Sequence, residues 1–470
     1  MKLLFVHGWS VTNQDTYGGL AEALVTASPD YLNLDIHHIH LGKYISFHDE
    51  VTLDDIARAF DKARLDAIGE DSFSCITHST GGPVVRLWAH IFYGSKFGLE
   101  GIPLKHIVML APANHGSALA QLGKSRLSRI NSFFDGIEPG VEVLNWLELG
   151  SSGQWDLNLK WLDYIPVDKG FYQFVLSGQT IDSKLYDFVN SYLVEKGSDG
   201  VVRLAAANMN YRYFSLRQDI SRKIGIVRDL RTNKELPISE LKINEEKTVY
   251  PEEIPFCVVA KASHSGSKIG IMKSVNPKNA VKKSVVNHII QCLGVQNKEQ
   301  FKIISDSFKI ITKNVQMTDR KCKDQYAMLV FRITDDRKNP VNDFDMLLLA
   351  GNDYRPDILP KGFFVDRQRN KICHNVLTYY VNCSKMKKAR DGKVGIRISA
   401  KPSDGFSYYS PAEFRSNGID LNDILIPNQT TLIDIELVRH VDQNTFRFTP
   451  FEDGKSNFKK AKPSGKGIPY

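Results

Sequence analysis

Short apolar runs alternate with longer amphipathic stretches through about the first 290 residues of the chain. Such runs are typical of buried strands, and the stretches between them repeat apolar residues at helical spacing. The predicted strands are 3–7, 34–40, 73–78, 106–111, 171–177 and 256–260, and the clearest helices are 18–27, 53–68 and 83–92. This alternation predicts an α/β fold with a mostly parallel sheet and helices on both of its faces.

The pattern changes near residue 300, where β-rich runs separated by turn residues follow one another. The expected strands are 308–311, 326–333, 344–349, 376–381, 394–399, 432–438 and 445–451. Their spacing is typical of a β-sandwich. We therefore expect an α/β domain over 1–297, a sandwich-like domain over 300–453, and a flexible basic tail over 454–470.

One serine stands where a predicted strand meets a predicted helix. The strand 73–78 runs into Ser79-Thr80-Gly81-Gly82, and a helical pattern starts at Pro83. A sharp strand–serine–helix turn with small residues beside the serine is how a nucleophile elbow exposes a hydroxyl above a sheet. Thr77 departs from the G-x-S-x-G pattern, so a buried serine at a strand end is the alternative interpretation.

Three further motifs accompany this serine. The first strand ends in His7-Gly8-Trp9, Asp199 lies between two glycines, and His264 follows a strand-like run. In motif and order the chain resembles the lipase-type α/β-hydrolases over about residues 1–295. In that fold the serine, the acid and the histidine follow one another in this order, unlike the order in chymotrypsin-like and subtilisin-like enzymes.

The resemblance implies a serine hydrolase that needs no cofactor. Ser79 would attack the ester, His264 would take and return its proton, and Asp199 would orient the imidazole. Backbone N–H groups of Thr80 and of Gly8 or Trp9 would form the oxyanion hole. The competing candidates are Asp182 and Asp187 for the acid, and His115 and His288 for the base.

Two insertions interrupt the alternating pattern. Residues 117–165 lie where many lipases carry a cap or lid, and a packed helix pair without contact to lipid is the alternative. The substrate-binding candidates in this cap are Phe133, Phe134, Leu144 and Trp146. Residues 216–253 are charged and predict a hairpin or a surface excursion. Because every candidate catalytic residue precedes 297, a chain ending there is expected to keep turnover of a short soluble ester.

Composition narrows the range of partners. The 470 residues are 42% hydrophobic, enough for a large core, and the net charge of +8 favours approach to anionic lipid. No dense basic helix or RNA-binding motif is present, so we expect no nucleic-acid partner. The strand 34–40 carries His37, His38 and His40, but no cysteine or acid lies at ligand-like spacing, so we expect strand histidines and no metal site.

The six cysteines are too few for a disulfide scaffold, and only Cys373 and Cys383 are spaced as though a strand pair could join them. The sequence contains no recognisable signal peptide and no apolar run of about 18 residues. We therefore expect synthesis in the cytoplasm, and action on outside lipids would need export without a leader.

Together these features favour a lipase or phospholipase that cleaves lipid esters through an acyl-enzyme. One alternative is a thioesterase or deacylase on acylated proteins, which would use the same triad. Another is an inactive hydrolase fold that serves as a binding module, against which the complete set of Ser79, Asp199 and His264 argues. The sandwich-like domain would hold the enzyme on a membrane or on a protein partner.

Overall fold

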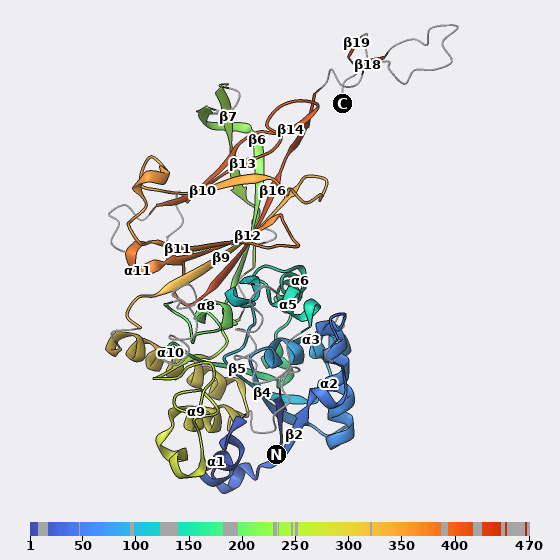
Figure 1. The fold of residues 1–470 in the computed structure, drawn as a ribbon, viewed down its shortest axis with the longest axis vertical. Helices are drawn as coiled ribbons and strands as arrows, with labels where there is room; N and C mark the ends of the chain where they lie inside the picture. Colours follow the sequence, from blue (N-terminus) through green and yellow to red (C-terminus); the bar gives the residue numbers. More distant parts are fainter. Residues whose placement is uncertain are drawn as a thin grey trace, which may run out of the picture.

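The computed structural model consists of an α/β part and a β-rich part stacked along its long axis (Figure 1). The residues that the structure describes are 1–7, 17–46, 48–94, 98–122, 140–181, 196–228, 233, 235–245, 248–249, 252–319, 322–386, 393–416, 425–442, 447–448 and 466–467. The N-terminus lies at the α/β end of the molecule and the C-terminus at the β-rich end (Figure 1).

The α/β part is built on a six-stranded sheet in which every neighbouring pair of strands runs parallel. Its strand order is β2-β1-β3-β4-β5-β8. The strands are β1 (Lys2–His7), β2 (Asp35–His40), β3 (Phe73–His78), β4 (Leu104–Leu110), β5 (Tyr172–Gly178) and β8 (Phe256–Val259). Parallel neighbours need long crossover connections, and the predicted helices 18–27, 53–68 and 83–92 lie in three of them. The predicted parallel sheet is thereby confirmed.

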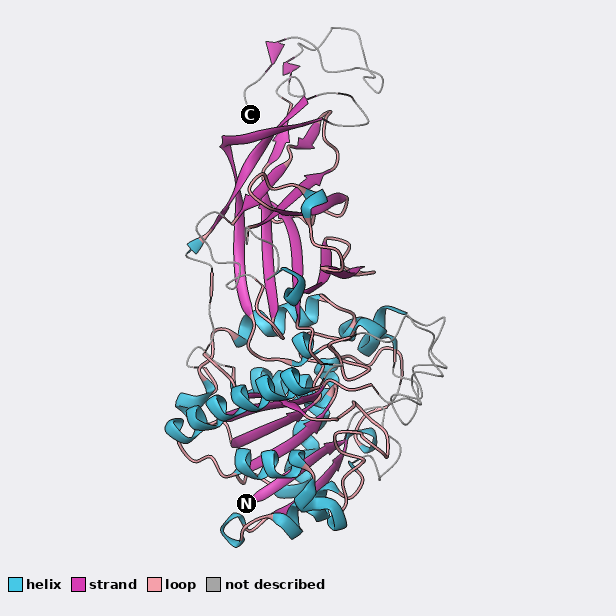
Figure 2. Cartoon of the chain, turned by 90° about the vertical axis from the view of Figure 1, so that its left-hand side faces the viewer, coloured by secondary structure: helices cyan, strands magenta, loops and turns pink. Residues whose placement is uncertain are grey.

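Helices cover both faces of this sheet (Figure 2). They are α2 (Leu53–Ile68) and α3 (Gly81–Tyr93) on one face, and α1 (Leu20–Ala27), α9 (Ser284–Leu293) and α10 (Lys298–Thr318) on the other. Successive side chains of a strand point to opposite faces. Strand β1 accordingly places Leu4 and Val6 in the core beneath α2 and α3, and Leu3 and Phe5 in the core on the opposite face.

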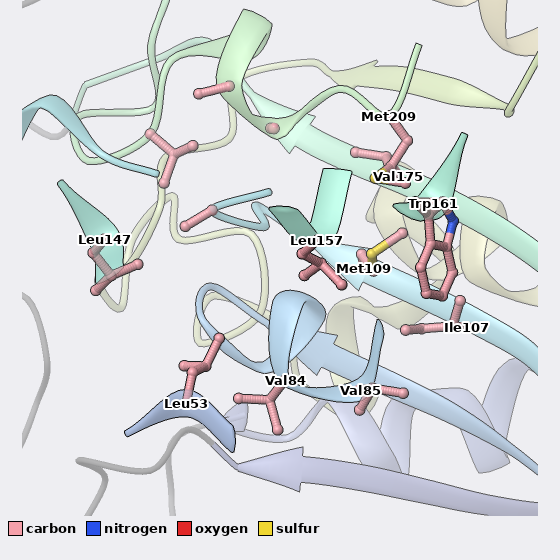
Figure 3. Packing of buried hydrophobic residues seen from close by; sticks show 14 of the residues in the cluster. Leu53, Val84, Val85, Ile107, Met109, Leu147, Leu157, Trp161, Val175 and Met209 are labelled. Atoms are coloured by element: carbon pink, nitrogen blue, oxygen red, sulfur yellow. The ribbon is translucent and has the colours of Figure 1, made fainter. Parts of the chain in front are cut away.

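The described part of the cap segment contains two short helices that pack into the same core as α2 and α3. Helix α5 (Val141–Leu147) and helix α6 (Ser152–Trp161) both contribute buried side chains to it. Figure 3 shows Leu147 and Leu157 in one apolar cluster with Val84 of α3. These two helices therefore form part of the folded core, as a packed helix pair does.

The β-rich part is one mixed sheet with the order β10-β13-β15-β7-β6-β16-β9-β12-β11. Its strands are β6 (Arg212–Arg228), β7 (Glu235–Ile243), β9 (Tyr326–Asp335), β10 (Phe344–Ala350), β11 (Phe364–Arg369), β12 (Val376–Asn382), β13 (Val394–Ala400), β15 (Ala412–Arg415) and β16 (Thr430–Leu437). The strands enclose an apolar core of their own. The prediction of an α/β-hydrolase-like part followed by a β-rich part is confirmed. The β-rich part is one continuous sheet that surrounds the second core.

Several short elements complete the described structure. They are α8 (Leu204–Ala207), α11 (Cys383–Met386), β14 (Ser407–Tyr409), β17 (Arg439–Val441), β18 (Arg447–Phe448) and β19 (Lys466–Gly467). The 3₁₀ helices are Asp30–Leu32, Leu41–Lys43, Ala118–Leu122, Pro166–Lys169, Pro277–Lys282 and Pro356–Ile358. Apart from β19, the basic tail 454–470 lies outside the described residues.

For the charged segment 216–253 the sequence predicted either a hairpin or a surface excursion, and the structure contains the hairpin. Strand β6 pairs antiparallel with β7, and β6 also pairs in parallel with β16 near the C-terminus of the chain. The hairpin therefore supplies two central strands of the nine-stranded sheet. The second part of the protein is not contiguous in sequence, because it takes these strands from between Asp199 and His264.

One predicted strand is wrong. Residues 308–311 belong to helix α10, whose buried side chains are Phe301, Ser305, Phe308, Thr312 and Gln316. These positions recur every three or four residues, which is the spacing of one helix face. The β-branched residues of the run suggested a strand, but the longer helical period decides the structure. Phe301 and Phe308 lie in the core against the parallel sheet, so the α/β part extends through α10.

The two parts also share a core. Side chains of the second sheet lie in the same buried cluster as α2, α3 and α6; they are Tyr326, Met328, Val330, Val376, Tyr380 and Leu432. Polar contacts accompany them: the Asn208 amide donates to the Asn428 carbonyl at 2.8 Å, and the Thr430 hydroxyl donates to the Ala205 carbonyl at 2.7 Å. The boundary between the parts is therefore a continuous packed interface.

Two expectations from the sequence concern disulfide bonds and membrane-spanning helices. Cys373 and Cys383 are both free thiols, so the strand pair is not joined by a disulfide. Among the described residues, no helix combines the length and the apolar character needed to cross a bilayer.

We predict that a chain ending at residue 297 does not fold stably. It would lose the two buried phenylalanines of α10, and deleting one such side chain costs about 3–5 kcal/mol, a large part of the roughly 5–15 kcal/mol that stabilises a typical domain. It would also leave β6 and β7 without β16 and β15. Thermal unfolding followed by circular dichroism measures this directly.

The matched control is a chain ending at residue 442, which keeps every strand of both large sheets. A monodisperse 1–297 chain that unfolds cooperatively and hydrolyses a short ester would restore the simpler two-domain interpretation of the sequence.

Candidate active site

Ser79 lies in the turn between β3 and α3 with its backbone in the left-handed region, at φ +52°. Such a conformation costs a non-glycine residue about 1–3 kcal/mol and persists only where the surroundings impose it. Here the Ser79 N–H donates to the Leu110 carbonyl at 3.1 Å, and the Ser79 carbonyl accepts from the Ala113 N–H at 3.3 Å. A Cβ on Gly82 would lie 2.9 Å from the Cβ of Pro112, so glycine allows this close approach.

Asp199 and His264 are brought together by a buried hydrogen bond. The His264 Nδ1 and the Asp199 Oδ2 are 2.9 Å apart, and neither side chain is appreciably exposed. The other carboxylate oxygen, Oδ1, accepts from the backbone N–H groups of Val201 (3.0 Å) and Val202 (2.8 Å). The His264 N–H also donates to the Asp199 carbonyl at 3.0 Å. Both carboxylate oxygens of Asp199 are thus held by hydrogen bonds. His264 is held to Asp199 through its ring nitrogen Nδ1 and through its backbone N–H.

His78, the residue before the serine, lies directly against His264. The two ring centroids are 4.6 Å apart, and the His78 Nε2 is 3.1 Å from the His264 carbonyl oxygen. Because a carbonyl only accepts, this nitrogen carries the proton. Burial, together with the nearby His264, lowers the pKa of His78 well below its usual value. From the sequence, His78 is interpreted as a structural residue of the serine turn, and the structure shows that it links this turn to the loop of His264.

The remaining predicted site residues fall into two groups. Thr80 is buried and occupies the N-cap position of α3, where the first backbone N–H groups of the helix lack intrahelical partners. Six candidate residues lie outside the described part of the chain: they are the oxyanion-hole candidates Gly8 and Trp9, the cap candidates Phe133 and Phe134, and the alternative acids Asp182 and Asp187. Among the described candidates, the structure joins Asp199 with His264 and places His78, next to Ser79, against them.

The alternative histidines lie in other surroundings. His115 is buried, with its Nδ1 3.2 Å from the Asn158 amide and its ring edge-on to Tyr211. His288 lies in α9, where its ring packs edge-on against Phe308. Both histidines have protein partners that belong to the core rather than to the serine turn.

Three histidines stack at the carboxyl ends of β1 and β2. The His7 Nε2 is 3.0 Å from the His38 Nδ1, and the rings of His7 and His40 are stacked with centroids 4.1 Å apart. Within the described ranges, no three His, Cys, Asp or Glu side chains are arranged to hold a metal ion. The three imidazoles pack against one another at this edge of the parallel sheet.

The two described cap candidates differ in exposure. Leu144 is buried, whereas Trp146 is only partly buried. The Trp146 indole packs directly on Gly153, since a Cβ placed on this glycine would lie 2.4 Å from the ring. Trp146 lines a groove of about 810 Å³ between α3 and α6, whose apolar walls also include Leu87 and Ile91. Such a volume lies within the usual range for a small-molecule site.

The whole chain is similar to phospholipase PlaB of Legionella pneumophila. PlaB in complex with thio-NAD has 39% sequence identity and a TM-score of 0.83, and the match covers 100% of each chain. A second PlaB structure has 40% identity and a TM-score of 0.84 over 99% of each chain. No protein-family model matches the chain. No curated protein sequence matches it either.

We predict that the protein loses stability as the pH falls from about 6.5 towards 3. Burial, reinforced by His40 and His38, lowers the pKa of His7 to about 3; burial, reinforced by Arg86, does the same for His115. Unfolding returns each pKa to about 6.5, so the unfolded chain binds more protons in this window. By pH 5, each histidine is then expected to lower the free energy of unfolding by roughly 2 kcal/mol. Urea unfolding from pH 7 to 5 measures the loss.

The variant His115→Gln should show a shallower pH dependence than the wild type, because one buried titrating group is gone. His48→Gln, at an exposed position, is the control and should keep the wild-type slope. Equal slopes for all three proteins would mean that His115 is not held neutral by burial.

Proposed function

The chain belongs to the family of phospholipase PlaB within the α/β-hydrolases, and on this premise we propose that it hydrolyses the carboxylic esters of phospholipids. The resemblance to lipase-type α/β-hydrolases that the sequence suggested is confirmed, as is the enzyme class of carboxylic ester hydrolase. The observation that best supports the proposed site is the buried Asp199–His264 hydrogen bond beside the strained turn that bears Ser79.

In the proposed mechanism the Ser79 hydroxyl attacks the carbonyl carbon of the ester. His264 takes the hydroxyl proton through Nε2, since its Nδ1 is engaged by Asp199. The carboxylate of Asp199 stabilises the imidazolium that forms. The same proton then passes to the leaving alcohol, which departs and leaves an acyl group on Ser79. Water activated by His264 releases the fatty acid in the second half of the cycle.

The tetrahedral intermediate needs donors for its negative oxygen. The Thr80 N–H is suited to this role, because it follows the nucleophile and lies at the N-terminus of α3, which favours negative charge. The second donor would come from Gly8 or Trp9, which follow β1 directly in sequence. The loss of one such donor typically costs about 10²–10³ in rate.

A lipid substrate is consistent with the apolar groove beside α3. The groove is lined by Leu53 at the start of α2, by Leu87 and Ile91 of α3, and by Trp146 of α5. Since Leu87 follows Gly81 by six residues, it lies about 9 Å along the helix axis from the start of α3. An acyl chain held at Ser79 is long enough to extend into this groove, so we propose that the groove receives the fatty-acid chain.

We predict that Ser79→Ala abolishes ester turnover and labelling by a fluorophosphonate probe, because only the attacking oxygen is removed. The fold should be unchanged, as judged by the unfolding midpoint. Ser305→Ala, which changes a buried serine of α10, is the control and should be labelled like the wild type. Labelling that persists in Ser79→Ala would place the nucleophile at another residue.

We predict faster hydrolysis of phospholipid vesicles than of a soluble short-chain p-nitrophenyl ester, with Trp146 contributing mainly to the lipid reaction. Trp146→Ser removes apolar surface from the groove, and each Å² of lost apolar burial costs about 25 cal/mol. It should lower fatty-acid release from vesicles at least fivefold while lowering short-ester turnover less than twofold. Phe92→Ser, which changes an exposed aromatic residue of α3, is the control. Equal losses on both substrates would argue against an acyl-binding groove at Trp146.

A further inference from the structure

The turn that carries Asp199 is covered by two tyrosines of the second sheet. Tyr380 on β12 is completely buried, and its hydroxyl donates to the Lys196 carbonyl at 3.0 Å and lies 3.3 Å from the Gly197 carbonyl. Tyr326 on β9 stacks on Tyr380 with ring centroids 5.2 Å apart. The contacts of the Tyr380 hydroxyl link residues that lie about 180 positions apart in the sequence.

Gly197 shows how closely the turn and the tyrosines meet. Its φ is +80°, and a Cβ at this position would lie 2.4 Å from both the Tyr326 Cδ2 and the Tyr380 hydroxyl oxygen. A larger residue at this position has no space on the side of the second sheet. The backbone of the turn therefore rests directly on the two phenol rings, two residues before Asp199.

The other end of the turn is held by the same strands. The Arg203 guanidinium is buried, lies 4.2 Å from the centre of the Tyr380 ring, and forms an ion pair with Asp366 on β11. A buried cation is tolerated only where such partners compensate for the lost water. Between these two ends, the Asp199 carboxylate accepts its backbone hydrogen bonds from within the turn.

We propose that Tyr380 is a positioning residue for the catalytic acid, acting through Lys196 and Gly197 to hold Asp199 against His264. This inference rests on the proposed function. Catalytic groups have to be held to within about 0.5 Å, and small displacements can cost up to about 10² in rate. Within the α/β part, the Leu204 N–H donates to the Gly197 carbonyl at 2.9 Å and the Ser117 hydroxyl donates to the Val201 carbonyl at 2.6 Å. The phenol hydroxyl adds the hydrogen bond from the second sheet, at the Lys196 end of the turn. The second sheet is thereby part of the active-site structure.

The neighbouring tyrosine provides a matched control. Tyr379 is also buried, and its hydroxyl donates to the Met346 carbonyl at 2.8 Å. Its ring, however, lies in the core of the second sheet, away from the acid turn. Tyr379→Phe and Tyr380→Phe therefore each remove one buried hydroxyl and one hydrogen bond to a backbone carbonyl, on adjacent residues of one strand.

The experiment measures kcat and KM for a soluble short-chain p-nitrophenyl ester with the full-length proteins. Tyr380→Phe should lower kcat about 10- to 100-fold with KM within twofold of the wild type, whereas Tyr379→Phe should retain wild-type kcat. In the Asp199→Asn background, Tyr380→Phe should cause no further loss, because its effect passes through the carboxylate. The low-field proton resonance of the Asp199–His264 hydrogen bond should be lost or displaced in Tyr380→Phe alone.

Three results would overturn the inference: wild-type kcat in Tyr380→Phe, an equal loss in Tyr379→Phe, or additive losses with Asp199→Asn. If Tyr380→Phe yields too little folded protein, Asp366→Asn is measured in the same way and should likewise lower kcat and not KM. Absence of turnover and probe labelling in the wild type would instead contradict the proposed function itself.

Discussion

A carboxylate that is fully removed from water has to find every hydrogen-bond partner within the protein, and this requirement shapes the structure around Asp199. One of its oxygens meets the His264 ring, and the other meets two backbone N–H groups of its own turn. Without those partners an isolated buried charge would cost far more than the fold can supply. The turn must therefore keep one conformation. Because it lies between the two sheets, both sheets have to be in place for it to do so.

The path of the chain makes the two sheets depend on each other. After the Asp199 turn and the short helix α8, the chain leaves the α/β part to build β6 and β7, and it returns to form β8 before His264. Central strands of the second sheet thus separate the acid from the base in sequence. Arg332 strengthens the junction, since it pairs with Asp434 at 2.7–2.8 Å and lies 4.5 Å from the centre of the Trp155 ring. A protein with this connectivity has no point at which one part can be removed cleanly.

The sequence predicts the parallel sheet and the serine turn well, because both are encoded by neighbouring residues. Helix α2 runs from Leu53 to Ile68 as expected, and its Thr52–Asp55 capping box is a local signal. Thr77 stands where the nucleophile-elbow motif has its first glycine, which made the motif harder to recognise. In the structure the Thr77 side chain is fully buried, and the glycines after Ser79 allow the turn. The contact of His78 with His264 was not predictable from spacing, since 186 positions separate them.

The second sheet shows which features the sequence could not predict. The sequence predicted the strands β9, β10, β12, β13 and β16 from short β-rich runs but not β11 and β15. Which strands are neighbours depends on long-range pairing that no local pattern encodes. The parallel pairing of β6 with β16 joins residues more than 200 positions apart, so the sequence could indicate a hairpin but not its place among the central strands of the sheet. The contribution of Tyr380 to the acid turn was hidden for the same reason. Its burial in the core of the α/β part and its hydrogen bond to the Lys196 carbonyl reveal it.

Several polar groups near the site are held in states that an isolated chain would avoid. Ser79 adopts a left-handed backbone, and among the described side chains the buried Nδ1 of His7 has no hydrogen-bond partner. Arg86 is fully buried between the side-chain oxygens of Asn114 and Asn158, and burial lowers its pKa to about 10. Each of these states costs free energy, and the extended apolar cores on both faces of the parallel sheet offset that cost. The second sheet contributes directly to one of those cores, so it supports the strained site energetically as well as through contact with the acid turn.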